Sequence, residues 1–178
     1  MDELFEILDE NGEPAGVVPR AQVHTEGFWH RAVHVWLFDL RGCVLLQRRG
    51  PNKDINPNLW DVSVGEHLIP GETYSEAAYR GVQEELSIRV DVLEPLGGER
   101  RVAFDWPQLG IHDHECQQAF RGVTDAAVTA ESTEIAELRW LWPNELCAWL
   151  STEPEAFTQG CVRDISELNL LSSVQADR

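Results

Sequence analysis

Two adjacent glutamates, Glu84 and Glu85, are the pair whose type and spacing most directly suggest chemistry in this sequence. They lie late in the segment 66–88, which turns at a Pro-Gly pair and then has a helical pattern, with Thr73 and Glu76 at capping-box spacing. Two carboxylates held on one rigid element suit a hard divalent cation such as Mg²⁺. The alternative is an ordinary amphipathic helix with solvated acids, because Glu is a good helix former.

The predicted helix must position both carboxylates. At about 100° per residue, Ala77 and Gly81 project on the same side as Glu84 and Glu85. The opposite side carries larger residues, namely Tyr79, Val82 and Leu86. We therefore predict that the larger residues pack against a sheet, while the side with Gly81 presents carboxylates and bare backbone.

This stretch resembles the Nudix box, in which a Gly, a Glu, an Arg and a later pair of Glu stand at fixed spacing along a loop and a helix. The residues in register are Glu72, Arg80, Val82, Glu84, Glu85 and Ile88. Three positions depart: Glu66 and Ser87 stand where the box has Gly, and Gly81 replaces the Glu after the Arg. The resemblance covers about residues 31–150 and implies an α/β fold, the Nudix-type α/β/α sandwich with a mixed sheet.

Gly81 leaves two interpretations open. In several Nudix proteins the Glu that it replaces binds metal or acts as the base. A Gly within a helix costs about 0.5–1 kcal/mol relative to Ala, so something must tolerate or use it. Either the box has decayed, or the base lies elsewhere, with Glu115 and His67 as the nearest candidates. We also expect the missing side chain to leave space for water or a substrate group.

A second set of candidate ligands lies outside the helix, although a single histidine is often an ordinary structural residue. Its members are His24, His30, His67, Asp113 and Glu115. Their order is similar to that in the isopentenyl-diphosphate isomerases, a branch of the Nudix superfamily. There, two His before the first core strand, one His at the box entrance and two later carboxylates bind a metal. Glu84 matches the carboxylate that this branch carries on its helix.

The resemblance to the isomerases extends to a loop at 48–58. Arg49 and Lys53 fall where those enzymes contact diphosphate. Arg can hold phosphate oxygens bidentately, whereas Lys acts as a point charge. We assign both residues, together with the box residue Arg80, to substrate binding.

One position disagrees with the isomerases. They have a Cys two residues before the His at the box entrance, where this chain has Gly65. Moving a carbon–carbon double bond requires a proton donor at that place. Isomerase activity is therefore disfavoured, while the metal-site architecture is retained.

Three functions follow from these residues. The first is a metal-dependent hydrolase of a small diphosphate compound, such as a nucleoside diphosphate linked to another group. In that function Glu84 and Glu85 hold Mg²⁺ or Mn²⁺, and the catalytic candidates are Glu85, Glu115 and His67. The second is an isoprenoid-diphosphate enzyme related to the isomerases. The third is a non-catalytic diphosphate-binding protein on a decayed Nudix scaffold.

Composition narrows the partners and the compartment. The formal net charge of −17 argues against nucleic acid and anionic membranes as main partners. No apolar run approaches the roughly 20 residues that span a bilayer. Four widely spaced cysteines without a CxxC pair indicate free thiols and a cytoplasmic location. We expect a small anionic substrate, and a homodimer is an open possibility.

The 178 residues suit one Nudix domain over 1–150, which includes an N-terminal hairpin, and a C-terminal helical appendage over 151–178. The pattern predicts hairpins at 5–18 and 32–47. Further strands are expected at 60–64, 88–93, 100–104, 116–123 and 138–142. A loop is expected at 105–114, and helices at 143–150 and 162–170.

Overall fold

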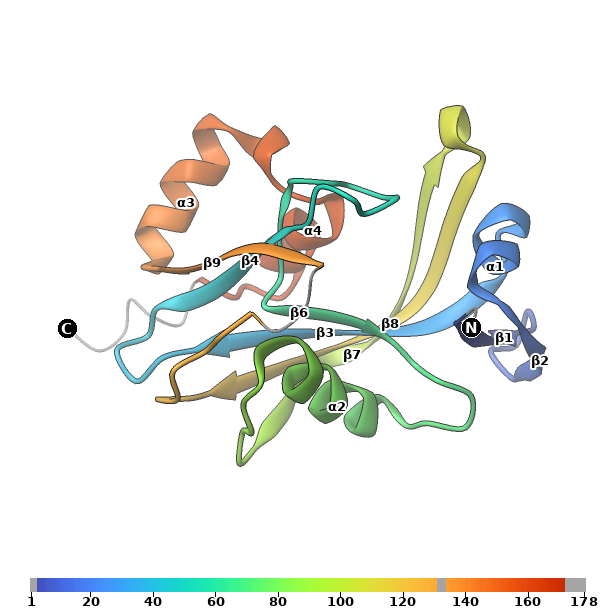
Figure 1. Ribbon diagram of the computed structural model, residues 1–178, viewed down its shortest axis with the longest axis horizontal. Coiled ribbons are helices and arrows are strands. Elements are labelled where there is room, and N and C mark those ends of the chain that lie inside the picture. Colours follow the sequence, from blue (N-terminus) through green and yellow to red (C-terminus); the bar gives the residue numbers. More distant parts are fainter. Residues whose placement is uncertain (1–2, 131–133, 172–178) are drawn as a thin grey trace.

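The computed structural model describes residues 3–130 and 134–171. Its strands are β1 (Leu4–Leu8), β2 (Pro14–Pro19), β3 (Trp29–Phe38), β4 (Val44–Arg49), β5 (Trp60–Asp61), β6 (Val64–His67), β7 (Leu93–Trp106), β8 (Ile111–Val123) and β9 (Ile135–Leu141). Its helices are α1 (Arg20–Glu26), α2 (Tyr74–Leu86), α3 (Pro143–Thr152) and α4 (Gln159–Glu167), with short 3-10 turns η1 (Pro107–Leu109) and η2 (Pro154–Ala156). The described strands form one mixed sheet, so the predicted α/β class is confirmed (Figure 1).

Strand β3 is the centre of the sheet. It runs parallel to β8 along its length and antiparallel to β6 and to the end of β1. Because β6 and β8 occupy both of its edges, β4 meets β3 only at Phe38 and Val44 and then pairs with β5 and β9. The second predicted hairpin is therefore correct at its turn, but its two strands separate.

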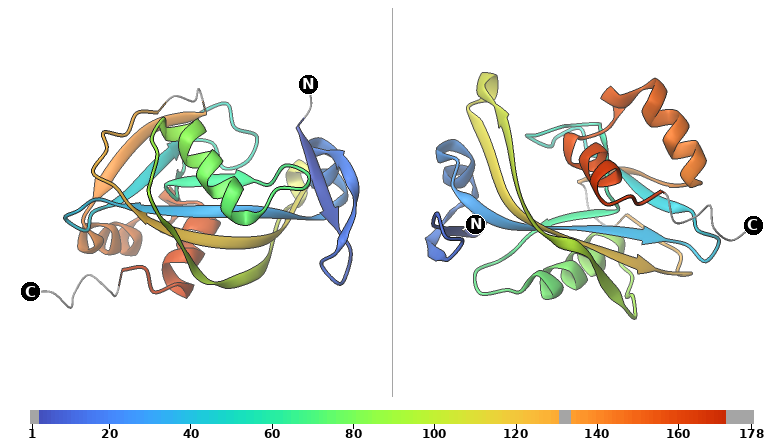
Figure 2. Two further views of the ribbon diagram at one scale, coloured as in Figure 1. Left: turned by 90° about the horizontal axis from the view of Figure 1, so that it is seen from below. Right: turned by 180° about the vertical axis from the view of Figure 1, so that it is seen from behind.

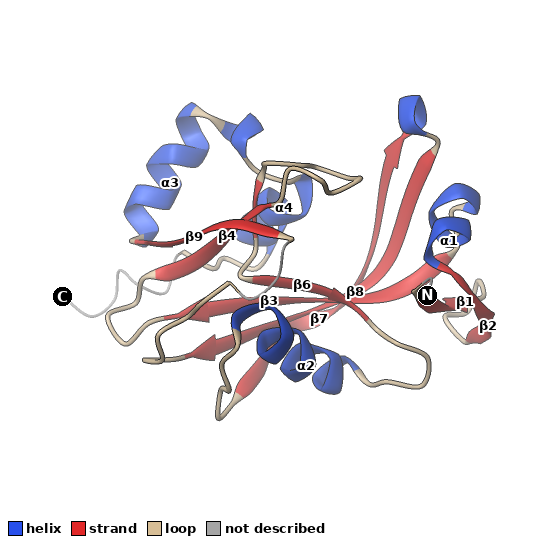
Figure 3. Ribbon diagram, in the orientation of Figure 1, coloured by secondary structure: helices blue, strands red, loops and turns tan. Residues whose placement is uncertain are grey.

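Alternation along β3 divides the core into two layers. Val33, Val35 and Leu37 face α2, whereas Trp36 and Phe38 belong to a second cluster that includes Leu146 of α3 and Cys161 of α4. Helix α2 accordingly covers one side of the sheet, and α3 and α4 cover the other (Figures 2 and 3).

Helix α2 begins as predicted. The Thr73 side chain accepts the backbone N–H of Glu76, and the Glu76 carboxylate accepts the backbone N–H of Thr73. The predicted faces of the helix are wrong, however. Ala77 and Gly81 are buried together with Val82 and Leu86, while Tyr79 is exposed. The helix lies so close to the sheet that its smallest residues, and not only its largest, form the contact.

The space expected beside Gly81 is not present. A Cβ atom at this position would lie 2.9 Å from Cγ1 of Val64 and 3.1 Å from Cβ of Glu66. Both neighbours belong to β6, which α2 crosses at this point. A residue without a side chain is therefore required for helix and strand to approach each other, and this requirement alone explains the glycine.

The long hairpin β7–β8 also differs from the prediction. The segment expected as a loop, 105–114, is mostly strand, because β7 continues through Trp106 and β8 starts at Ile111. A turn at Pro107–Leu109, closed by Gly110 at φ 64°, joins them. The segment at 88–93 is not a strand until Leu93. Polar residues are frequent in the segment 105–114 because this end of the β7–β8 hairpin stands out from the sheet beside α1 (Figure 1).

The C-terminal segment contributes to the core as far as it is described. Phe157, Cys161 and Leu170 are buried in the second core cluster, and the N–H of Thr158 donates to the carbonyl of Trp60. The expected division at residue 150 falls within α3. Residues 172–178 lie outside the described part of the chain, as do 131–133. Within residues 3–130 and 134–171, every helix is too short or too polar to cross a membrane.

Candidate metal centre and active-site pocket

The floor of the pocket is one face of three neighbouring strands. Strand register places Ala32 of β3 beside His67 of β6 and Gln117 of β8. Because side chains alternate along a strand, residues two apart share this face. The residues brought together in this way are Gly65 and His67 on β6, His30, Ala32 and His34 on β3, and Asp113, Glu115 and Gln117 on β8.

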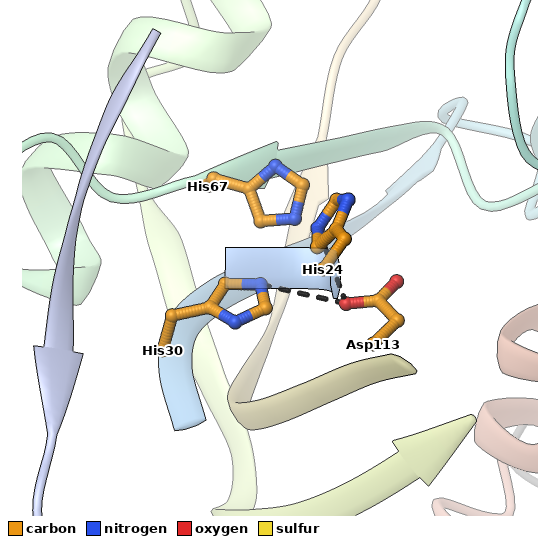
Figure 4. Close-up of side chains that lie close together, drawn as sticks. All are labelled: His24, His30, His67 and Asp113. Atoms are coloured by element: carbon orange, nitrogen blue, oxygen red, sulfur yellow. Dashed lines mark ion pairs between the residues drawn. The ribbon is translucent and has the colours of Figure 1, made fainter. Parts of the chain in front are cut away.

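Four of the predicted metal ligands meet at one end of this floor. They are His24, His30, His67 and Asp113, and their ligand atoms all lie within 4.8 Å of one another (Figure 4). The Nε2 atoms of His24 and His30 lie 3.7 Å and 3.4 Å from Oδ1 of Asp113. Helix α1 supplies His24, so the N-terminal segment builds part of the cluster.

The cluster contains buried polar atoms that face one another. His30 donates its Nδ1–H to the carbonyl of Phe28 at 3.1 Å, so its Nε2 carries a lone pair. That lone pair, Nε2 of His24 and Oδ1 of Asp113 are buried without a hydrogen-bond partner among the described residues. Unpaired buried polar atoms are costly, and a cation between them removes the cost. The donor set therefore fits a divalent metal ion.

The electrostatics of the cluster agree with that fit. Burial lowers the pKa of His24 to about 3 and the pKa of His30 to about 4, so both rings are neutral at pH 7 and able to bind metal. Burial, followed by the charge of Glu115, raises the pKa of Asp113 to about 7. Phe5 of β1 packs against the rings of His24, His30 and His67 and supplies an apolar wall.

Glu115 is the fifth predicted ligand and adjoins the cluster. Its Oε1 lies 3.2 Å from Nε2 of His67, and the Gln117 amide donates to its other oxygen. Burial opposes charge on both partners of the pair. Their mutual interaction outweighs burial, so it raises the pKa of His67 and lowers that of Glu115.

The carboxylates of α2 form a different group. Glu84 has 58% of its side chain exposed and binds Arg80 at 3.1 Å. Arg80 also contacts Glu66 and Glu72 and donates to the carbonyl of His67 at 2.8 Å. These carboxylates raise the pKa of Arg80. Arg80, which we assigned to substrate binding, is therefore occupied in joining the box loop to α2.

The side chain of Glu85 reaches from α2 to Gln47 of β4. Its Oε2 accepts a hydrogen bond from the amide of Gln47 at 3.0 Å. Burial, followed by the charge of Glu66, raises the pKa of Glu85 to about 8. Neither Glu84 nor Glu85 belongs to the histidine cluster or lines the pocket.

The two basic residues of the predicted diphosphate loop have different positions. Arg49 lines the pocket, where it binds Asp61 at 3.1 Å and the carbonyl of Ile55. Lys53 binds Glu134 at 2.6 Å and is not among the lining residues. Only Arg49 is therefore placed to contact a molecule in the pocket.

Several pocket residues were missed from the sequence. They are Arg20, His34, Asp61, Glu66, Gln117 and the run Thr158 to Gly160. His34 could have been found, because it is four residues after His30 on a predicted strand and so shares its face. The run at 158–160 carried no signal, since only the packing of α4 brings it to the sheet.

A further group, Asp105, His112 and His114, lies on the outer part of the β7–β8 hairpin and is partly exposed. His112 and His114 both contact Oδ1 of Asp105, at 2.6 Å and 3.2 Å. His114 also contacts the carbonyl of Gly27, so these residues fasten the hairpin to the end of α1.

Known proteins resemble this chain along most of its length. A family model described as NUDIX domain matches residues 28–161. A protein of Nocardia farcinica named isopentenyl-diphosphate Delta-isomerase is 38% identical over 154 residues, which cover 86% of this chain and 87% of that protein. An uncharacterised Nudix hydrolase of Pseudomonas aeruginosa, PA4841, is 35% identical over 141 residues and 79% of each chain.

The fold agrees with these relatives. The crystal structure of DR0079 from Deinococcus radiodurans matches with a TM-score of 0.63 and 29% identity, covering 84% of this chain and 90% of that one. The sandwich predicted from the box is thus confirmed by a solved structure as well as by the strand order. Since the family model spans most of the residues and the relatives exceed 30% identity over most of the length, this chain belongs to the Nudix family.

Proposed function

We propose that this protein is a metal-dependent hydrolase of a small diphosphate-containing compound, such as a nucleoside diphosphate linked to another group. The observation that carries the proposal is the set of buried, unpaired polar atoms of His24, His30 and Asp113, of which His24 and Asp113 line the pocket. Three features support hydrolysis of a diphosphate: membership of the Nudix family, a group of side chains that fits a cation, and an arginine in the same pocket. Water attacks a phosphorus atom, and the bond to the bridging oxygen breaks.

The donor set favours a transition metal at the histidine cluster. Imidazole nitrogens together with carboxylate oxygens suit Mn²⁺ or a similar ion better than Mg²⁺, which prefers oxygen alone. His24, His30, His67 and Asp113 would hold this ion, with Glu115 as a further ligand. Such an ion stabilises phosphate charge and lowers the pKa of water. Glu66 lines the pocket and offers oxygen only, which suits Mg²⁺ brought with the substrate.

The residues of the chain divide the remaining work. Arg49 lines the pocket and can turn its guanidinium from Asp61 toward phosphate oxygens. Glu115 is the charged partner in its hydrogen bond with His67 and can accept a proton from the attacking water. Arg80 holds the carbonyl of His67 and thereby fixes the strand that carries the partner of this base.

The second candidate is an isoprenoid-diphosphate enzyme, favoured by the relative named as an isomerase. Gly65 argues against it, because it stands where the isomerases have their cysteine. The lining residues of the described pocket include no cysteine. Cys116 alternates with Glu115 and Gln117 and so projects from the other face of β8. No thiol is therefore placed to donate the proton that moving a double bond requires.

One screen tests both candidates. The purified chain is incubated with Mn²⁺ or Mg²⁺ and with dinucleotide, nucleoside-diphosphate-linked and isoprenoid diphosphates. Phosphorus NMR then follows cleavage, and proton NMR follows movement of the double bond. We expect metal-dependent cleavage of at least one linked diphosphate. Double-bond movement without cleavage would contradict the proposal. Ligand-induced stabilisation without turnover on any compound would identify a binding protein.

A further inference from the structure

His34 is a buried histidine in the pocket to which none of the chemistry above gives a role. It lies on β3 on the same face as His30, lines the pocket and has 12% of its side chain exposed. Its neighbour across the strand pair is Gly65, and Gly160 of α4 approaches it from the other side. The imidazole therefore lies between two residues that have no side chain.

Asp164 of α4 fixes the orientation of this ring. Its Oδ2 lies 2.8 Å from Nδ1 of His34 and accepts the indole N–H of Trp36 at 3.0 Å. Its Oδ1 accepts a guanidinium N–H of Arg100 at 2.7 Å. Only 1% of the Asp164 side chain is exposed, and these partners lower its pKa to about 2 despite burial. A carboxylate can only accept, so His34 donates its Nδ1–H and directs Nε2 away from Asp164.

The two glycines leave room for the imidazole. A Cβ at position 160 would lie 3.2 Å from Cε1 of His34, close enough to displace the ring. A Cβ at position 65 would lie 3.9 Å from its Cδ2, which is ordinary contact. Gly160 is therefore required by the present position of His34, and the ring edge with Nε2 stays open to the pocket.

The structure shows no acceptor for Nε2 of His34 among the described residues. The amide nitrogen of Gln117 lies 3.4 Å away, but this amide is a donor that binds Glu115, so it cannot accept a hydrogen from a protonated Nε2. The charged groups around the ring are Asp164 from α4, Arg100 from β7, Glu115 from β8 and Asp61 from β5. Burial opposes charge on His34, but Asp164 and the other carboxylates outweigh it and raise the pKa of His34 to about 9. This raised pKa favours a second proton on the ring, at Nε2, where the N–H faces the pocket without an acceptor among the described residues and is free to donate to an oxygen of a bound ligand.

We propose that His34 is a catalytic residue of this pocket, a general acid whose Nε2–H protonates the oxygen that leaves phosphorus, and that Asp164 is its positioning residue. This assignment rests on the proposed hydrolase function. The oxygen of water forms a bond to phosphorus and gives one proton to Glu115, which releases it to solvent after the reaction. The phosphorus–oxygen bond to the leaving group breaks, and that oxygen takes the proton of His34. A proton from solvent then restores the ring.

The test compares three variants in steady-state hydrolysis with Mn²⁺. His34→Gln should lower kcat by about 10²-fold or more while KM changes less than threefold, as expected for loss of a general acid. Gly160→Ala keeps the histidine but displaces its ring, and Ala is a better helix residue than Gly, so kcat should fall while the melting temperature is kept. His112→Gln changes a partly exposed histidine on the outer hairpin, is the matched control and should retain kcat.

Two readouts distinguish chemistry from structure. Asp164→Asn should move the alkaline limb of the kcat profile to lower pH, because the charge that keeps His34 protonated is gone. Calorimetric Mn²⁺ affinity should be unchanged in His34→Gln, which shows that the histidine cluster is intact. A His34→Gln variant that binds Mn²⁺ normally and keeps kcat within threefold of the parent would overturn the assignment.

A direct measurement does not depend on turnover. In the unmodified protein, ¹⁵N NMR of the His34 ring is followed while imidodiphosphate, which is not hydrolysed, is added with Mg²⁺. We expect the Nε2 signal to move and the Nδ1 signal to stay close to its position. A parent chain without activity on any diphosphate would contradict the hydrolase, and the NMR result would then decide separately. An unmoved Nε2 signal at saturating ligand would overturn the contact between His34 and phosphate.

Discussion

The histidine cluster and the carboxylates of α2 are both groups of candidate metal ligands, but their polar atoms have different partners. In the cluster, Nε2 of His24, Nε2 of His30 and Oδ1 of Asp113 are buried and face one another without a hydrogen-bond partner in the described part of the chain. On α2, Glu84 is bound to Arg80 and Glu85 accepts the amide of Gln47. A cation would satisfy the atoms of the first group, whereas the second group is largely neutralised by the protein itself.

This difference shows that spacing within a motif does not by itself identify a metal ligand. The glutamates of the box resemble those of the family in spacing, yet one of them is an exposed partner of Arg80. The histidines are scattered along the chain, yet the fold brings their ligand atoms and that of Asp113 within 4.8 Å of one another. The partners of these atoms, more than their position in a motif, therefore distinguish the group that fits a metal ion.

The largest expected effect is on metal affinity. His30→Gln removes a ring nitrogen from the cluster and puts in an amide that can donate to Asp113, so Mn²⁺ affinity should fall about 100-fold or more. Loss of residues that merely support a ligand already costs 10–100-fold. Glu84→Gln should change the affinity less than threefold, because Glu84 is exposed and paired with Arg80. Calorimetry measures both, and an equal loss in the two variants would remove the contrast between the groups.

The next effect concerns Gly81. Gly81→Glu returns the residue that the Nudix box has after its Arg. Since a Cβ there would lie 2.9 Å from Val64, the variant should instead lose about 3 kcal/mol or more of unfolding free energy through overpacking and burial of a charge. Urea denaturation of the metal-free protein measures the loss. Adding Val64→Ala should recover part of it, and a Gly81→Glu protein as stable as the parent would contradict the close packing.

The two groups should respond to pH in opposite directions in the metal-free protein. His24 and His30 have pKa values below those of the unfolded chain, so their contribution to stability is present above pH 6.5 and is lost as pH falls through about 4 and 3. The pKa of Glu85 is raised to about 8, so its contribution is present below pH 4.5 and is lost as pH rises through 8.

The variant Glu85→Gln tests the predicted direction in which stability changes with pH. The variant should match the parent near pH 5 and exceed its unfolding free energy near pH 8.5, by about 1–2 kcal/mol after allowance for solvent screening. His30→Gln should instead flatten the loss of stability below pH 6.5. Chemical denaturation across the pH range, with chelator present, measures both. A Glu85→Gln variant that is less stable than the parent at pH 8.5 would show that the parent carboxylate is charged and paired.

The smallest effect extends the contrast to the basic loop. Arg49 lines the pocket, whereas Lys53 is paired with Glu134 outside the lining. Arg49→Ala should raise the Kd of imidodiphosphate about tenfold, a typical cost of a charge-assisted hydrogen bond. Lys53→Ala should change it less than threefold and alter stability by under about 1 kcal/mol. Fluorescence titration measures both, and similar losses would place both residues in the binding site.

The sequence predicted the elements that local rules specify. The capping box of α2, the Asn-Gly hairpin and the strands on either side of the box depend on neighbours a few residues apart. The resemblance to the isomerases named His24, His30, His67 and Asp113, which the fold brings together, and Glu115, which adjoins them. Together these gave the fold class and the group of residues that the geometry supports best for metal binding.

The remainder depends on contacts between distant segments. The close approach of α2 to Val64 reverses the predicted faces of that helix, because a glycine may mark either open space or tight packing. Asp164 has no local signal at all, and it reaches His34 only because α4 packs on the sheet. The outer hairpin was read as a loop since its strands are solvated and their polar composition resembles that of a loop.

The parallel pairing of β3 with β8 has a consequence for the order in which the protein folds. His30 and Glu115 are neighbours in that register, but the whole of α2 and the β7 strand separate them in the chain. Contacts between distant segments slow folding, because the entropy of closing the intervening chain is lost before the contact forms. On a ribosome, the N-terminal histidines emerge long before Asp113 and Glu115. The complete ligand set can therefore exist only once β8 has docked, so metal capture would report the completion of folding and would not initiate it.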